Sequence, residues 1–182
     1  MSDFAIERGV KSYEDELQRG RVPNQSTVEK FGRATVGTTY VPIAFGNVYQ
    51  QLQVAAATTL RVKAGNGNDT AAGSGAREIT LDGLDETGAR VTPALATAGA
   101  SASDATTETF IRLYRYYVSA SGTYSAGITG SHDSNIVIEN GAGGTDWATI
   151  DSTDIPRGQS EIACYTVPLG KTATISHVHV TV

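Results

Sequence analysis

Two histidines near the end of the chain have the spacing of a metal-binding pair. His177 and His179 are two residues apart, so their imidazole rings share one face if this segment is a β-strand. Such a pair holds zinc only when a further ligand approaches it. The alternative is two polar side chains on a sheet surface or at a subunit interface. We favour this alternative and expect neither a metal nor any other cofactor.

A second group of residues superficially resembles a hydrolase triad. His132 and Asp133 are adjacent and are flanked by Ser131 and Ser134. Triad members converge from separate structural elements, because adjacent residues in one loop cannot take the required geometry. We therefore assign these four residues no catalytic role.

Three other candidates for chemistry lack essential parts. The run 66–70 (NGNDT) places oxygen ligands at alternate positions, but it has neither the acidic first position nor the bidentate Glu of a calcium loop. A solvated hairpin turn is the better interpretation. The run 141–144 (GAGG) lacks the Lys and the following helix of a phosphate-binding loop. Cys164 is expected to be a buried structural thiol. With no catalytic residues, we predict that the protein is not an enzyme.

The overall composition narrows the class of protein. The chain has 182 residues, a formal net charge of −5 and one Cys. An acidic chain is poorly suited to binding nucleic acid through phosphate contacts, and a single Cys excludes an intrachain disulfide. No apolar run approaches the roughly 20 residues of a membrane span. We therefore expect neither nucleic acid nor membrane as a partner.

The N-terminal arm, residues 1–33, differs in composition from the rest of the chain. It is rich in both acids and bases, and its large apolar side chains are too scattered to form a core. Ser12 is a suitable N-cap for a short helix over 13–19 that ends at Gly20. We predict an arm that orders on a partner surface, and the alternative is a frayed terminus. The residues expected to contact the partner are Phe4, Ile6, Val10, Tyr13, Leu17, Phe31 and Arg33.

The remainder, 34–182, has the period-2 alternation of β-strands separated by Gly and Asn turns. Short strands at this spacing predict a mainly β domain, either an antiparallel β-sandwich or a barrel, jelly-roll-like in type. The stretches 96–106 and 119–133 are predicted to be exposed loops. The predicted strands cover 48–54, with Ala55–Ala57 as a strand edge, and then 60–63, 78–82, 88–95, 107–118, 134–139, 160–167 and 171–182.

Two of these strands carry large side chains on both faces or an apolar face without an obvious cover. In 107–118, one sandwich core would use only one face, so the other must be covered by the arm, by a loop or by another subunit. Interleaved Arg and Tyr could also stack on nucleic-acid bases, but packing is the better interpretation for an acidic domain. We predict a homo-oligomer, a trimer, whose contact involves Tyr114, Tyr116, Val178 and Val180.

The run 68–77 (NDTAAGSGAR) predicts a rigid hairpin tip. Asp69 and Thr70 are suited to an Asx-type turn, and Gly73 and Gly75 permit left-handed backbone. Arg77 begins the next strand, where it is expected to pair with Asp69 or with a neighbouring subunit.

Several segments together resemble a group of structural proteins from the virions of tailed bacteriophages, in particular cyanophages. The most specific are Lys30-Phe31-Gly32-Arg33 and the run 68–77, which leads into 79–85 (ITLDGLD). The segments 110–121 and 158–170 (GQSEIACYTVPLG) are similar to that group too, so the resemblance covers most of the chain.

The resemblance implies a virion component and supplies no catalytic residues. The favoured role is a capsid decoration, or cement, protein that binds the major capsid protein through its β-domain and arm. A head–tail connector or tail-fibre attachment module is the first alternative. A carbohydrate-binding β-sandwich is a weaker one, because Trp147 is the only Trp and sugar sites commonly use several aromatic platforms.

Overall fold

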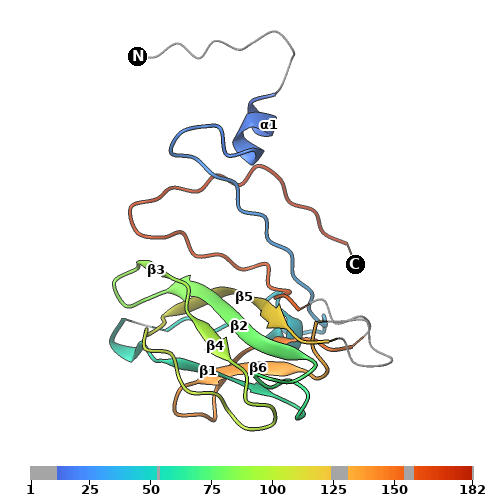
Figure 1. Ribbon diagram of the computed structural model, residues 1–182. Helices are drawn as coiled ribbons and strands as arrows, with labels where there is room; N and C mark the ends of the chain where they lie inside the picture. The colour runs from blue at the N-terminus through green and yellow to red at the C-terminus, as the bar shows by residue number, and fades with distance from the viewer. Residues whose placement is uncertain (1–11, 53, 124–130, 154–157, 182) are drawn as a thin grey trace. The chain divides into compact units, whose positions relative to one another are not determined.

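The chain folds as a mainly β protein with two antiparallel sheets and one short α-helix (Figure 1). The computed structural model describes residues 12–52, 54–123, 131–153 and 158–181. It divides into two units, 1–30 and 31–182, which are described separately. The predicted mainly β class with antiparallel sheets is confirmed.

The helix α1 spans Tyr13–Gln18 in the first unit and begins where the sequence predicted. Ser12 caps it: its hydroxyl accepts from the Asp15 N–H, and the Asp15 carboxylate accepts from the Ser12 N–H, which satisfies two groups that helical bonds leave free. Gly20, with φ of 68°, ends it. No residue of α1 is buried. The arm residues Phe4, Ile6 and Val10 lie outside the described residues.

The smaller sheet has three strands in the order β1-β6-β7: β1 (Leu60–Ala64), β6 (Ile136–Asn140) and β7 (Asp146–Ile150). Val62 lies opposite Ile138, which lies opposite Ala148, so these apolar residues share the face that is buried. Gly143 and Gly144 form the turn between β6 and β7 with φ of 84° and 85°. Side chains disfavour that backbone region, so glycine suits both positions.

The larger sheet is built around the long strand β2 (Ala76–Leu84). Along one edge β2 pairs with β5 (Arg112–Ser121), and along the other it pairs with the short strands β3 (Arg90–Val91) and β4 (Ala94–Ala96). Pro93 separates β3 from β4, since proline has no N–H for the ladder.

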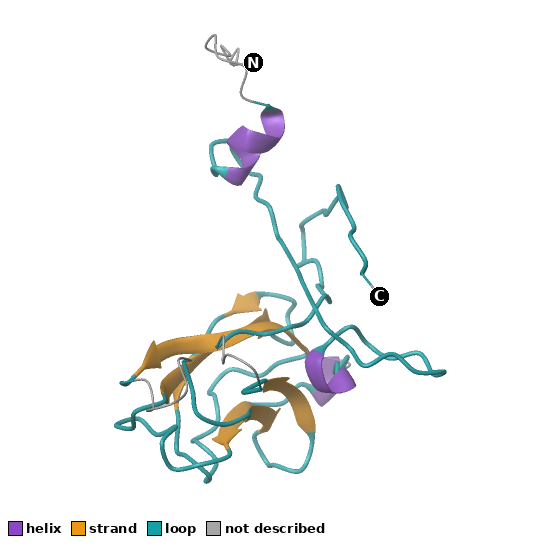
Figure 2. Cartoon of the chain, turned by 90° about the vertical axis from the view of Figure 1, so that its right-hand side faces the viewer, coloured by secondary structure: helices purple, strands orange, loops and turns teal. Residues whose placement is uncertain are grey.

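One hydrophobic core lies between the two sheets, which form two layers in Figures 1 and 2. Both sheets contribute to it, so neither is stable without the other. The largest apolar side chains that are fully buried are Tyr116, Phe110, Leu60, Ile79, Leu81, Ile136, Ile138, Ile150, Ile162 and Val62.

The outer edge of β1 is covered by the segment 99–106, which the sequence analysis took for an exposed loop. Gly99 accepts through its carbonyl from the Ala64 N–H, while Ser103 and Thr106 donate from their N–H groups to the carbonyls of Val62 and Leu60. The prediction was wrong because it judged this segment by side chains alone. Its backbone supplies the hydrogen bonds that the edge strand needs.

Several predicted strand boundaries are also wrong. Residues 48–52 form no strand, and residues 54–56 form a single 3₁₀ turn where the end of that strand and a strand edge were expected. The segment 160–167 makes only isolated bridges, and 171–181 pairs with no strand among the described residues (Figure 2). The strand β7 was missed. Alternation reports which faces differ in polarity, and it does not report whether a partner strand is within reach.

The sequence analysis left open what covers the second face of the strand that became β5, and residues of the same chain cover it. Leu113, Tyr114 and Tyr116 are all buried, although they lie on opposite faces. The Tyr165 ring packs edge-on against the Tyr114 ring at a centroid distance of 5.1 Å. Backbone bonds join Tyr116 and Val118 to Ser160 and Gly158. The segment 158–165, rather than a second subunit, covers this strand.

Removing a ring from the core should be costly. Phe110→Ala should lower the free energy of unfolding by about 3–5 kcal/mol, because the fully buried Phe110 ring leaves a cavity between the sheets. Urea denaturation measures the change. Tyr40→Ala, at a fully exposed ring, is the matched control and should change little. Equal effects of the two substitutions would contradict the described core.

Candidate functional site

A buried carboxylate joins two loops at one end of the β-domain. Asp69 is fully buried, and its side chain accepts hydrogen bonds from the N–H groups of Ala76, Asp133 and Ser134 at 2.8–3.0 Å. The Ser134 hydroxyl donates a further bond at 2.9 Å. These donors compensate for the removal of the charge from water. Asp69 therefore fixes the loop before β2 to the loop before β6.

The expected hairpin tip is therefore not a solvated turn, and its parts act differently from the prediction. Gly73 and Gly75 do not have positive φ. They are needed for space, because a Cβ at Gly73 would collide with the Asn68 carbonyl and one at Gly75 with the Asp69 carboxylate. Arg77 donates from Nε to the Gly73 carbonyl at 2.8 Å, so a bond to backbone stands where a pair with Asp69 was expected.

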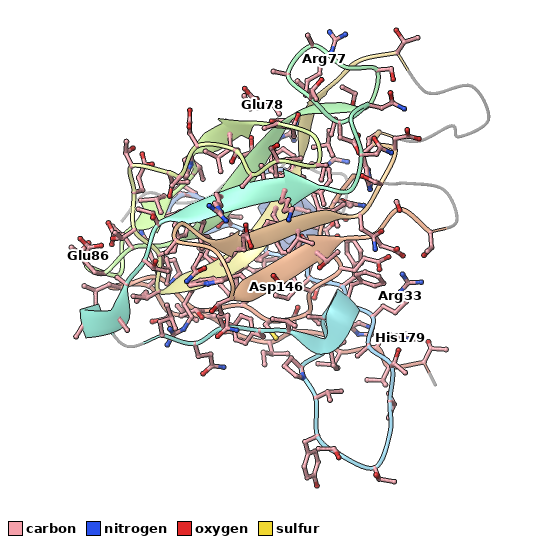
Figure 3. The ribbon with its side chains drawn as sticks, turned by 90° about the horizontal axis from the view of Figure 1, so that it is seen from below. Arg33, Arg77, Glu78, Glu86, Asp146 and His179 are labelled. Atoms are coloured by element: carbon pink, nitrogen blue, oxygen red, sulfur yellow. The ribbon has the colours of Figure 1, made fainter. Side chains whose placement is uncertain are left out.

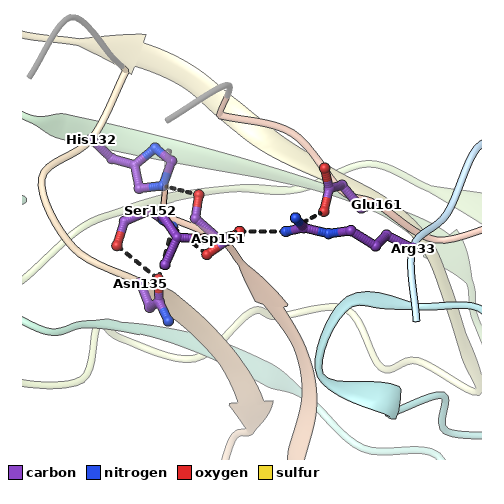
Figure 4. Close-up of polar contacts among 7 residues, drawn as sticks. Arg33, His132, Asn135, Asp151, Ser152 and Glu161 are labelled. Atoms are coloured by element: carbon purple, nitrogen blue, oxygen red, sulfur yellow. Dashed lines mark hydrogen bonds and ion pairs between the residues drawn. The ribbon is translucent and has the colours of Figure 1, made fainter. Parts of the chain in front are cut away.

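A polar network links this end of the domain to the end of β7 (Figure 4). The buried His132 bonds through Nε2 to the Asp151 carbonyl at 3.0 Å and through Nδ1 to the Ser131 hydroxyl at 2.9 Å. Burial lowers the pKa of His132 despite the nearby carboxylates of Asp69, Asp151 and Asp133. The histidine that resembled a triad member thus stays neutral and holds two loops together.

Arg33 connects the end of the N-terminal arm to the β-domain. Its Nη2 lies 2.5 Å from Asp151 Oδ2 and 3.1 Å from Glu161 Oε2, and its guanidinium lies 5.1 Å from the centre of the Phe45 ring (Figure 4). Burial would raise the pKa of Asp151, but hydrogen bonds from Thr153 and Arg33 outweigh it and lower that pKa. Arg33 was predicted to contact a partner, and here it binds within its own chain.

Gly32, next to Arg33, lies directly against the backbone of Ile43 and Ala163, where a larger residue would not fit. The Ala163 N–H donates to the Ile43 carbonyl at 2.9 Å, and a Cβ at Gly32 would collide with both groups of that bond. Phe45 N–H also donates to the Glu161 carbonyl at 3.0 Å. The Lys-Phe-Gly-Arg element therefore joins the segment after the arm to the segment that leads to the C-terminus.

The large apolar side chains that are exposed in the described residues lie toward the two ends of the chain. Within the described residues, every large hydrophobic side chain that is exposed falls in 13–43 or 167–180, and none in the sheets between them. They include the predicted contact residues Tyr13, Phe31, Val178 and Val180, whereas Leu17 is partly buried. The full set is Tyr13, Val28, Phe31, Val36, Tyr40, Ile43, Val167, Leu169, Ile175, Val178 and Val180.

The other two predicted subunit contacts are inside the molecule. Tyr116 is fully buried and Tyr114 nearly so, and burial raises the pKa of both phenols. Asp82, which is held by a bidentate pair of bonds from Arg90, lies beside Tyr114. Neither tyrosine offers its side chain to a second subunit in this fold. Sequence reasoning missed this because the covering segment 158–165 is not a sheet strand.

The described residues include no group of three or more His, Cys, Asp or Glu side chains that could hold a metal ion. His177 and His179 are exposed, and His179 Nε2 lies 3.1 Å from the Thr181 hydroxyl. In Figure 3 the labelled side chains of Glu78, Glu86 and Asp146 lie at separate places on the domain. The α-helix of this part of the chain, with six residues, is far too short to span a membrane.

Comparison with known protein families, with curated proteins and with solved structures found no match to this chain. The geometry itself therefore carries the functional argument. It consists of a β-domain in which Asp69 joins two loops, and of two terminal segments that carry the exposed large apolar side chains of the described residues.

Replacing the Asp69 carboxylate should destabilise the whole domain. Asp69→Asn keeps the size but turns an NH₂ group toward N–H or hydroxyl donors, leaving a buried donor without an acceptor. We expect a loss on the order of 3 kcal/mol in the free energy of unfolding. The exposed Asp104→Asn is the control and should be nearly neutral. Equal melting temperatures of the two variants would contradict the proposed role of Asp69 in joining the two loops.

The buried His132 should make stability depend on pH. Its pKa is lowered in the folded state, so below about pH 6.5 the unfolded chain binds a proton that the folded chain does not. Stability should therefore fall as the pH drops from about 6.5 toward the folded pKa, by at most about 1.4 kcal/mol per pH unit. Urea unfolding at pH 7.5 and 5.5 measures the slope. His132→Gln should be less stable at pH 7.5 and show a smaller slope, whereas an unchanged slope would assign the effect to other groups.

Proposed function

We propose that this chain is a structural protein of a tailed-phage virion: a capsid decoration protein that binds and stabilises the shell of major capsid protein. One observation carries the proposal: the exposed large apolar side chains of the described residues lie on the two terminal segments of the chain. The resemblance of Lys30–Arg33 and of the run 68–77 to virion proteins supports it. Both elements fix backbone in place, through Arg33 and through Asp69.

The energetics suit a protein that clamps neighbouring subunits. Each exposed apolar side chain contributes about 1.5–3 kcal/mol when a partner buries it fully. Tyr13 and Val28 are 59% and 53% exposed, so most of that stabilisation is still available. Contacts by the β-domain and by the arm add as linked binding events, which raises occupancy beyond that of either contact alone. The arrangement proposed on the particle is a homotrimer whose β-domain lies on the shell.

A head–tail or tail-fibre role would use the same apolar contacts of the arm, but at another place in the virion. A head–tail connector or tail-fibre module would use the same arm at a site with far fewer copies. A carbohydrate-binding role has less support, because Trp147 is 3% exposed and lies in the core instead of forming a platform. Quantitative mass spectrometry of particles from the phage that encodes this chain tests the position. A copy number similar to that of the shell protein supports decoration, a small fraction of it indicates a connector, and absence from the particle rejects the proposal.

Changing apolar side chains of the arm should weaken attachment without unfolding the domain. The double variant Tyr13→Asp/Val28→Asp should show retention on those particles weakened on the order of tenfold, since two apolar contacts worth more than about 1.4 kcal/mol are lost. Co-sedimentation measures retention. Its control, Gln18→Asp/Ser26→Asp, adds the same charge at exposed polar positions of the same arm. Equal retention of the two variants would remove the arm from the binding mechanism.

A further inference from the structure

The last part of the chain has the sequence of a β-strand but no partner strand. From residue 175 to 181 (ISHVHVT), Val178 and Val180 alternate with His177, His179 and Thr181. Ile175, Val178 and Val180 are 82%, 70% and 70% exposed, and no backbone bond joins this segment to another strand among the described residues. In such a strand Val178 and Val180 share one face, whereas Ile175 lies on the other face with the two histidines. The exposed valine face is unfavourable in water, so it needs a cover.

The start of this segment is fixed to the β-domain. The Tyr165 ring packs on Tyr114, and the Tyr49 and Thr166 hydroxyls lie 3.1 Å apart. Lys171 N–H then donates to the Pro168 carbonyl at 3.1 Å, which closes a turn. Beyond this turn the segment is exposed throughout its described length. Fully extended, its eleven described residues (171–181) reach up to roughly 40 Å.

Three of the four sheet edges in the described part of the fold are poor sites for an added strand. The edge of β1 is bonded to 99–106, and that of β5 to Gly158 and Ser160. The edge formed by β3 and β4 is broken by Pro93, and the Gln50 side chain donates to the Asp146 carbonyl of β7. A second copy would therefore offer its own C-terminal segment as a partner more readily than one of its sheets.

The segment is complementary to itself. Val178 and Val180 are placed symmetrically about His179, so two copies aligned at His179 bring valine beside valine on one face, whichever way the strands run. No Asp, Glu, Lys or Arg occurs from 172 to 181, so two neutral copies do not repel each other. A charged partner would find no complementary charge there.

We propose that residues 175–181 pair as a β-strand with the same segment of a second copy of this chain, and that this pairing holds the oligomer together. This deepens the proposed function by naming the surface through which copies associate, and it rests on that function only for its place in the virion. The isolated protein tests it, so its failure is distinct from a failure to bind particles.

Light scattering after size exclusion, at tens of micromolar, gives the first test. The full chain should be a dimer or trimer, and Val180→Lys should convert it to a monomer with an unchanged melting temperature. Val36→Lys is the matched control, since Val36 is 78% exposed on the other terminal segment. A monomeric full chain, or a Val180→Lys variant that associates as before, would overturn the proposal.

Cross-linking gives the second test, because residue 179 meets its own copy in either strand orientation. In a Cys164→Ser background, which removes the one native thiol, His179→Cys should form a disulfide-linked pair under mild oxidation. Val36→Cys in the same background should stay unlinked at that concentration. An oligomer in which His179→Cys links no better than Val36→Cys would assign the contact to another surface and overturn the pairing.

Discussion

The fold depends on one buried negative charge that is fully hydrogen-bonded. Asp69 receives bonds from Ala76 at the start of β2 and from Asp133 and Ser134 just before β6, so a single carboxylate sets the positions of strands in both sheets. A carboxylate removed from water is stable only while its donors stay in place. The two loops and the two layers are therefore held in one arrangement, and Gly73 and Gly75 are required because they leave room for it.

Side-chain periodicity was enough to predict the class of fold and most of its central strands. The alternation of Leu60 and Val62 and that of Ile79 and Leu81 mark β1 and β2 correctly, because each of these strands has one face against the core. The same alternation misled at 171–181, which pairs with no strand in the described part of the chain. It missed β7, in which Trp147 and Ala148 are adjacent and both buried, so the period-2 pattern is absent.

The candidate site was less predictable, for a physical reason. An Asp among Asn and Gly residues is typical of a solvated turn, and only three-dimensional packing brings backbone N–H groups from distant residues around it. The two glycines that follow Asp69 were a usable signal, but of close approach rather than of left-handed backbone. Arg33 was noticed for its charge, whereas its acceptors, Asp151 and Glu161, come from the far end of the sequence.

The junction at Arg33 determines how the domain would respond to mechanical tension. Arg33 pairs with Asp151 and Glu161, and backbone bonds join Ile43 to Ala163 and Phe45 to Glu161. The two segments that leave the β-domain are therefore joined to each other before either reaches a sheet. A pull on both ends would act first on this short pairing and its ion pairs, not on the ladders of β2 and β6. The junction would thus yield before the core, so the two terminal segments could lengthen while the two packed sheets stay folded.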